Sequence, residues 1–256
     1  MSLPTTPGVL TPWVQFAGST PSHRLRLLCF HHAGGGASFY RQWVPKLAAH
    51  GIDVWPIQLP GREQRFTETK ATDLTVLARE LTRFLAPRLD GQPYAVYGHS
   101  AGVAVGAAFA LRMREIGRPG PVHAFLAACR PPSHPDPDSP VHQLSTPALL
   151  AKLRAYGGTP PEVFDTPELM EMILDVTRAD LRLVETAPAP AGPWFQCPVT
   201  ALGGEADRTV PAELLPYWRV VSGGRFDCAV LPGGHFPAAE HLLEQITGVF
   251  ATGSAR

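Results

Sequence analysis

The chain has 256 residues, 45% of them hydrophobic, and its 22 basic residues are balanced by 22 acidic ones. A chain of this length can bury about three quarters of its unfolded surface in one large domain. Because a neutral protein has no long-range attraction for phosphate groups, this composition disfavours nucleic acid and anionic membranes as partners. The sequence also lacks the run of about 20 apolar residues that crosses a bilayer and a basic, then apolar, secretion leader. We therefore expect a cytoplasmic protein.

Short apolar runs of strand length alternate with longer helical patterns along the chain. The runs typical of buried strands are Trp13–Phe16, Leu25–Phe30, Asp53–Leu59, Tyr94–Tyr97, Ala124–Cys129, Val199–Leu202 and Cys228–Leu231. The helical patterns among them are Phe39–Ala49, Leu74–Leu89, Val103–Ile116, Pro211–Val221 and Pro237–Phe250. Nearly continuous apolar runs indicate strands covered on both faces. The alternation therefore predicts an α/β fold, with a mostly parallel sheet and helices on both sides.

One stretch interrupts this alternation. Residues 130–140 read RPPSHPDPDSP, and their five prolines exclude a helix or a central strand. Two helical patterns follow, Pro147–Tyr156 and Pro167–Glu185, before a second proline cluster at 188–193. Long inserts between strands are often functional lids. We expect residues 130–193 to form a lid, with a decorative helical insertion as the alternative.

The remaining residues, 1–129 and 194–256, are then expected to form one core, with loosely ordered ends up to Pro12 and from Ala251. The cysteines are widely spaced and form no C-x-x-C pair: Cys29, Cys129, Cys197 and Cys228. Three of them lie within or at the end of apolar runs, where cysteine behaves as a small hydrophobe. We therefore expect no disulfide, no metal and no cofactor.

The most informative motif is GHSAG, Gly98–Gly102, which lies between a predicted strand and a helix of small residues. In that context G-x-S-x-G is typical of a nucleophile elbow, a sharp turn that exposes a serine above the sheet. Glycines fit so tight a turn because they have no Cβ. The motif predicts Ser100 as a nucleophile, and a plain glycine-rich turn is the alternative.

A serine nucleophile of this kind requires an acid and then a base later in the chain. His235 lies in a glycine-rich loop just after the last predicted strand, whereas its competitor His241 falls within the last helical pattern. Asp207 follows the preceding strand, where parallel sheets collect functional groups; Glu205 is its nearest rival. We predict His235 as the base and Asp207 as the acid.

Acyl transfer also requires two hydrogen-bond donors for the developing oxyanion. The N–H of Ala101, directly after the nucleophile, is expected to supply one. The second is expected from the loop HHAGGG, residues 31–36, with Ala33 as the chosen donor. The pair His31 and His32 has no third ligand at metal-binding spacing, so we assign it a structural role.

Five segments together resemble one enzyme family, the type II thioesterases, which are stand-alone editing hydrolases of polyketide and nonribosomal peptide assembly lines. The segments are FHHAGGGASFYRQW (30–43), QLPGREQRF (58–66), GHSAG (98–102), the loop of Asp207, and PGGHF (232–236). Their order and spacing cover nearly the whole chain. The LPGRE segment separates this family from general esterases.

The resemblance implies an α/β-hydrolase core, a mobile helical lid and a Ser-His-Asp triad. Carried onto this sequence, the triad is Ser100, His235 and Asp207, with Ala33 and Ala101 as oxyanion donors. The implied substrate is an acyl thioester on the phosphopantetheine arm of a carrier domain, which is the implied partner. Two departures concern the acyl site: Ala101 replaces a methionine common in relatives, and Pro-Ala-Ala follows the PGGHF segment where a second aromatic is commoner.

Several further residues have two interpretations. On the insert helix, Met170, Met172 and Ile173 are expected to cover the acyl chain, because flexible methionines suit varied acyl groups. Asp180 lies on the apolar stripe of the same helix, and a local salt bridge to a nearby arginine explains it better than a catalytic role. The arginines of QLPGREQRF, at positions 62 and 65, either contact the carrier or form internal salt bridges.

Three other functions fit the same motifs. A small-ester esterase or lipase would use the same triad but prefer oxygen esters. An acyltransferase would pass the acyl group to an alcohol or amine. A non-catalytic binding protein of the same fold is the non-enzymatic alternative, and the presence of all three triad residue types argues against it.

Overall fold

The computed structural model describes residues 12–18 and 23–252. Six strands in this part of the chain form one sheet in the order β2–β1–β3–β4–β5–β6, and every pairing is parallel. The strands are β1 (Leu25–Phe30), β2 (Ile52–Pro56), β3 (Tyr94–His99), β4 (His123–Ala127), β5 (Val199–Gly204) and β6 (Phe226–Leu231). The predicted α/β class is confirmed.

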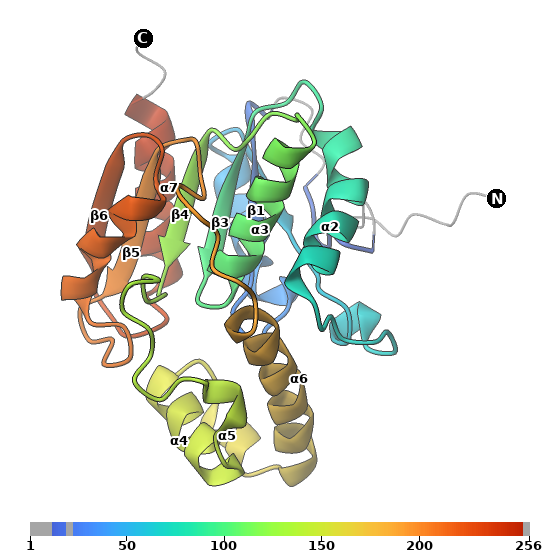
Figure 1. The fold of residues 1–256 in the computed structure, drawn as a ribbon, viewed down its shortest axis with the longest axis vertical. Helices are drawn as coiled ribbons and strands as arrows, with labels where there is room; N and C mark the ends of the chain where they lie inside the picture. The colour runs from blue at the N-terminus through green and yellow to red at the C-terminus, as the bar shows by residue number, and fades with distance from the viewer. Residues whose placement is uncertain (1–11, 19–22, 253–256) are drawn as a thin grey trace.

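Helices cover both faces of the sheet (Figure 1). The α-helices are α1 (Trp43–Ala48), α2 (Leu74–Leu89), α3 (Gly102–Glu115), α4 (Thr146–Tyr156), α5 (Pro161–Phe164), α6 (Pro167–Glu185) and α7 (Ala239–Thr252). The 3₁₀ helices are η1 (Ala37–Tyr40), η2 (Glu63–Arg65), η3 (Val141–Gln143) and η4 (Ala212–Val221). Side chains from α2, α3 and η4 form one buried cluster with the sheet, and side chains from α1 and α7 form another.

The alternation of side chains along β1 explains the two clusters. Leu28 and Phe30 belong to the cluster with α2 and α3, whereas Leu27 and Cys29 belong to the one with α1 and α7. Successive residues of a strand point to opposite faces, so an uninterrupted apolar run fills both layers. The central strands are therefore buried on both sides and hold their carboxyl ends in fixed positions.

Three expected elements differ from the structure. The run Trp13–Phe16 is not a strand: only Val14 forms an isolated antiparallel bridge, to Ile57, and Phe16 leaves the extended conformation with a φ of 57°. The pattern 39–49 divides into η1 and α1. The pattern 211–221 is a 3₁₀ helix, and Pro216 inside it lacks the N–H that an α-helix requires.

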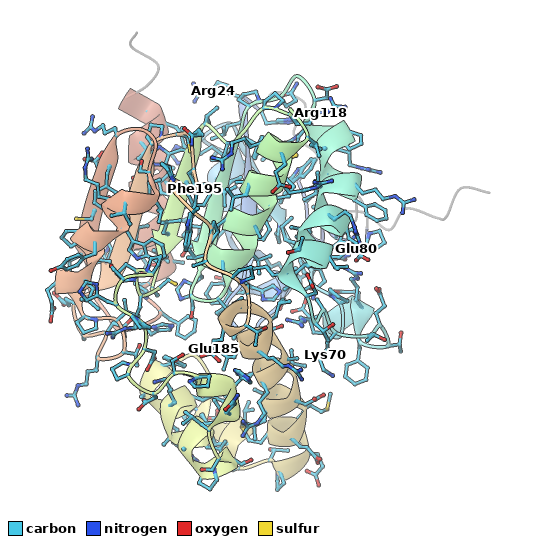
Figure 2. All side chains as sticks on the ribbon, viewed as in Figure 1. Arg24, Lys70, Glu80, Arg118, Glu185 and Phe195 are labelled. Carbon is cyan, nitrogen blue, oxygen red and sulfur yellow. The ribbon has the colours of Figure 1, made fainter. Side chains whose placement is uncertain are left out.

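The segment between β4 and β5, residues 128–198, contains η3, α4, α5 and α6 and is called the insert below. Figure 1 shows its helices beyond the carboxyl ends of the strands. Glu185, labelled in Figure 2, joins the end of α6 to η3 by accepting the N–H groups of Val141 and His142 at 2.7 and 3.0 Å. The expected lid, 130–193, falls within the insert, and its mobility stays a prediction. The expected loose ends lie almost entirely outside the described residues.

Gly102 is fixed by the close packing of α3 against β1. A Cβ at this position would lie 2.1 Å from the carbonyl oxygen of Phe30, an atom of the backbone that cannot rotate away. We expect Gly102→Ala to lower the free energy of unfolding by about 1–3 kcal/mol, as overpacking does. Urea titration followed by tryptophan fluorescence measures this change.

Gly248 provides the matched control, since it lies exposed in α7 and its Cβ would meet no atom within 4 Å. Gly248→Ala should raise stability by about 0.5–1 kcal/mol, because alanine loses less backbone entropy in a helix. Equal effects of the two substitutions would contradict this account of the elbow.

Candidate active site

Ser100 occupies a strained turn between β3 and α3. Its φ is 52°, in the left-handed region that residues other than glycine rarely adopt. The N–H of Ser100 donates to the carbonyl of Ala127 at 2.8 Å, which fixes the turn against β4. A Cβ on Gly98 would lie 2.6 Å from the Cα of Val103. The turn therefore requires its glycines and places Ser100 at the carboxyl edge of the sheet.

His235 and Asp207 form a buried hydrogen-bonded pair across the loops after β6 and β5. The Nδ1 of His235 lies 2.8 Å from Oδ2 of Asp207, and the side chains are only 3% and 1% exposed. The rivals are placed differently: Glu205 is exposed, and His241 faces Glu244 on α7 at 3.8 Å. The structure thus brings together the histidine and the carboxylate that the sequence favours.

The second oxygen of Asp207 is also fully occupied. Oδ1 accepts the backbone N–H groups of Thr209 and Val210 at 2.8 and 3.0 Å and the hydroxyl of Thr209 at 2.6 Å. Burial by itself raises the pKa of Asp207, but the bonds from His235, Thr209 and Val210 outweigh it and lower the pKa to about 2. The carboxylate therefore stays charged and holds the Nδ1–H tautomer of His235.

The residue between Gly98 and Ser100 supports the histidine loop. His99 Nε2 lies 3.0 Å from the carbonyl oxygen of His235, its Nδ1 lies 3.1 Å from the hydroxyl of Tyr97, and its ring stacks on Phe236. Burial lowers the pKa of His99 well below its usual range. A neutral His99 donates through Nε2 to the carbonyl and accepts from Tyr97, so one tautomer satisfies both bonds.

Two cavities meet beside Ser100 and His235, and both residues line each of them. The larger has a volume of about 630 Å³ and extends along α3 as far as Glu115. The smaller, about 180 Å³, lies between the loop of Ala33 and the insert. Within the described residues, the Ser100 hydroxyl makes no hydrogen bond to His235; catalytic contacts of this kind often tighten only when substrate binds.

Sequence reasoning missed two residues that contact the pair. Tyr156, at the end of α4, stacks on the imidazole of His235 with ring centroids 4.4 Å apart, and it lines both cavities. Its burial raises the pKa of its hydroxyl. No local pattern marks an aromatic residue of the insert for this contact. Thr209 could have been found, because an aspartate often bonds the N–H two residues further on.

The loop after β1 contributes Ala33 to the smaller cavity that Ser100 also lines. The N–H of Gly34 donates to Asp180, and that of Gly35 donates to the carbonyl of His32. In the described part of the chain, the N–H groups of Ala33 and Ala101 are paired with no protein acceptor. Gly34 is therefore already engaged, and Ala33 and Ala101 are the free donors next to the serine.

The two arginines of the segment QLPGREQRF form internal contacts. Arg62 binds Asp180 of α6 through two hydrogen bonds of 2.6 and 2.9 Å, with both side chains almost fully buried. Asp180 thus forms an ion pair, as expected, but its partner is distant in the chain and not local. Arg65 pairs with Glu68 at 2.6 Å and lies over the ring of Trp13.

The three residues of α6 that we expect to contact the acyl chain are placed differently from one another. Ile173 lines the smaller cavity, whereas Met170 and Met172 line neither. Met170 is buried, and Met172 is 46% exposed. Residues 170 and 172 point in nearly opposite directions because successive helical residues are about 100° apart. One face of the helix cannot present both methionines together with Ile173.

The pair His31 and His32 is enclosed by its surroundings. Burial and the nearby charge of Arg62 lower the pKa of His31 to about 3, and burial together with His31 and His235 lowers that of His32 to about 3 as well. Both rings are therefore neutral. Across the described residues, no three His, Cys, Asp or Glu side chains are grouped as metal ligands, and no helix there is long and apolar enough to span a membrane.

A parallel sheet, a serine on a strained elbow and a buried histidine–aspartate pair beside it define the α/β-hydrolase fold. The family model of the thioesterase domain matches residues 25–251. The chain therefore belongs to this thioesterase family, whose members hydrolyse thioester bonds.

Individual relatives agree with this assignment. "Linear gramicidin dehydrogenase LgrE" of Brevibacillus parabrevis is 36% identical over 227 residues, 88% of this chain and 86% of its own length. "Gramicidin S biosynthesis protein GrsT" of Aneurinibacillus migulanus is 32% identical over 237 residues, 91% of each chain. The structure of the type II thioesterase BorB, from the borrelidin biosynthetic cluster, superposes with a TM-score of 0.80 at 34% identity, covering 94% and 97% of the two chains.

The name of the first relative describes redox chemistry, whereas the matched family and the superposed structure are thioesterases. The serine, histidine and aspartate described above fit the second description. The predicted resemblance to type II thioesterases is confirmed.

The low pKa of Asp207 predicts how its contribution to stability depends on pH. The folded value of about 2 lies below the ordinary value of 3.8, so the ionised carboxylate stabilises the folded state. This contribution is complete above about pH 4 and is lost as the pH falls toward about 2. We expect the stability difference between wild type and Asp207→Asn to be constant near neutral pH and to shrink below about pH 4. Urea titrations at each pH measure it, and a difference that grows on acidification would contradict the assignment.

Proposed function

We propose that this thioesterase releases acyl groups from the phosphopantetheine arm of carrier domains, as an editing enzyme of polyketide or nonribosomal peptide synthesis. The observation that carries the proposal is the buried His235–Asp207 pair at the junction of two cavities that Ser100 also lines. The type II thioesterase BorB supports the choice of pathway by similarity. All four cysteines are free, which fits a reducing cytoplasm, where we place the enzyme.

The first step transfers the acyl group to the enzyme. Ser100 Oγ attacks the thioester carbonyl while His235 Nε2 takes its proton, and Asp207 stabilises the resulting imidazolium. The N–H groups of Ala33 and Ala101 bind the oxyanion, each contributing about 3 kcal/mol as in other acyl-transfer enzymes. Collapse of the intermediate breaks the C–S bond, and the thiol leaves with a proton from His235.

The second step restores the free enzyme. His235 removes a proton from water, the hydroxide oxygen attacks the acyl-serine carbonyl, and the same two amides bind the new oxyanion. Collapse breaks the bond to Oγ, returns the proton to Ser100 and releases a carboxylic acid. The Tyr156 ring covers one face of the imidazole and limits the approach of bulk water.

The larger cavity suits the acyl chain. It runs along α3 from Ser100 to Glu115, a helical span of about 20 Å. Alanines at 104, 107 and 108 of α3 line it, together with Leu181 and Val184 of α6. Small apolar side chains leave room for a long unbranched or lightly substituted chain. We assign the acyl contacts to this stripe of α3 in place of the two methionines of α6.

Replacement of the nucleophile tests the mechanism. Ser100→Ala should lower kcat for a dodecanoyl carrier-domain thioester at least about 10,000-fold, because no other group can form the acyl-enzyme. Product release followed by mass spectrometry of the carrier measures the rate. Near-full activity of the variant would overturn the mechanism.

The same assay separates the related functions. Wild type should hydrolyse the carrier thioester faster than a matched dodecanoyl oxygen ester, and added alcohols or amines should not divert the product. Preference for the oxygen ester would indicate an esterase, and acyl transfer to the additive would indicate an acyltransferase. A fluorophosphonate probe should label wild type and not Ser100→Ala.

Ala108 offers a test of the acyl site. Ala108→Leu would narrow the larger cavity about halfway along α3, and the side chain is only half-buried, so the fold should tolerate it. We expect kcat/KM for a dodecanoyl thioester to fall about tenfold or more, the size of effect a steric misfit causes in an apolar pocket. The acetyl thioester, too short to reach position 108, is the control and should be hydrolysed at the wild-type rate. Equal losses with both substrates would place the acyl chain elsewhere.

A further inference from the structure

We propose that Asp180 is a positioning residue of the hydrolysis reaction. When α6 is seated on the core, Asp180 accepts the N–H of Gly34 and thereby fixes the backbone of residues 31–36, called the oxyanion loop below. Formation of the oxyanion hole is thereby coupled to the position of the insert. The inference rests on the proposed function in one respect, the role of the Ala33 amide as an oxyanion donor.

The contact that carries the inference is a carboxylate shared between two partners. Asp180 Oδ2 accepts the N–H of Gly34 at 2.9 Å and Nη1 of Arg62 at 2.6 Å, while Oδ1 accepts Nη2 of Arg62 at 2.9 Å. The Arg62 guanidinium also donates to the carbonyl of Pro60 at 3.0 and 3.3 Å. A fork of this kind fixes the carboxylate in both position and plane.

These bonds define the orientation of the neighbouring peptide units. The carbonyl of His32 and the N–H of Ala33 belong to one planar trans unit and point in opposite directions. That carbonyl accepts Gly35 N–H at 3.1 Å and Nδ1 of His31 at 2.8 Å, which aims the Ala33 N–H away from them. The next peptide unit carries the Gly34 N–H, and Asp180 holds it. The peptide units on both sides of the Ala33 Cα are therefore held by hydrogen bonds while Asp180 is in place.

A second contact of α6 lies one turn earlier on the same face. Gly34 has a φ of 77°, and a Cβ on it would lie 2.3 Å from the Thr177 hydroxyl oxygen. Thr177 and Asp180 are three residues apart and so share one side of the helix. The helix thus packs on Gly34 and bonds its N–H at the same time.

The segment QLPGREQRF bonds the residues that follow the oxyanion loop. Glu63, next to Arg62, accepts the backbone N–H of Ser38 at 3.3 Å and its hydroxyl, and Gln58 accepts the N–H of Ala37 at 3.0 Å. The far end of the loop is therefore held by the core alone, and the near end depends on Asp180. If α6 moves away, Gly34 N–H loses its acceptor, and the peptide unit that follows the Ala33 N–H is free to rotate, so the Ala33 amide keeps only the support of the His32 carbonyl. Hydrolysis therefore occurs only while the insert is seated on the core.

Two double variants separate positioning from simple stabilisation. Asp180→Asn with Arg62→Gln keeps an oxygen acceptor for Gly34 in a neutral pair, whereas Asp180→Leu with Arg62→Met replaces the pair by apolar side chains and removes the acceptor. Apolar replacement of a buried ion pair is commonly tolerated by the fold. Only the second variant should lose activity, with kcat falling about 100-fold, as when one oxyanion donor is removed, while KM and the pH profile remain as in wild type.

The ion pair between Lys70 and Asp175 is the matched control. It also joins the core to α6, at 2.7 Å, but it is exposed, and no hydrogen bond connects it to the oxyanion loop among the described residues. Asp175→Asn should leave kcat unchanged. Equal losses in both double variants, or a loss in Asp175→Asn as large as in the apolar pair, would overturn the proposal, as would an unchanged kcat in the apolar pair.

A measurement on wild type keeps the test independent of how the variants fold. The Gly34 amide should exchange with deuterium far more slowly than an unbonded loop amide, because Asp180 accepts its N–H whenever the insert is seated. Exchange as fast as in a free loop would overturn the inference. Fluorophosphonate labelling of wild-type Ser100 tests the proposed mechanism separately, so a failure there is distinguishable from a failure of the coupling.

Discussion

The backbone strain at Ser100 is the constraint around which the rest of the site is arranged. A left-handed conformation at a residue with a side chain costs free energy of order 1 kcal/mol, and the turn persists because β3, β4 and α3 hold it from three sides. The hydrogen bond to Ala127 and the close approach of Gly102 to β1 tie the turn to two strands of the buried sheet. The continuous apolar strands thus serve the chemistry by fixing one serine at their carboxyl edge.

Burial gives the site its electrostatic character. Removing His235 and Asp207 from water strengthens their mutual attraction, but it also makes every unpaired polar atom costly. Hydrogen bonds offset this cost: Thr209 and Val210 donate to the carboxylate, and His99 donates to the backbone carbonyl of His235. The same principle applies at Asp180, whose charge is matched by a buried arginine.

The insert contributes more than a cover. It supplies Tyr156 against the imidazole, one wall of each cavity, and the carboxylate that bonds the oxyanion loop. An insert that both covers the site and bonds its backbone excludes water from the serine while it holds the loop in place. Such an arrangement suits an editing enzyme, because acyl groups that do not allow the insert to seat would not be hydrolysed.

The sequence by itself determined the fold class, the elbow at Ser100 and the choice of His235 and Asp207, because these depend on local periodicity and on the fixed order of strands. It could not find Tyr156, could not name the partner of Asp180, and could not tell that Ile173 lines a cavity beside Ser100 whereas Met170 and Met172 line neither of the two cavities there. Those features depend on how the insert lies on the core. Contacts between segments far apart in the chain leave no local pattern, so only the tertiary structure decides which face of α6 meets the oxyanion loop.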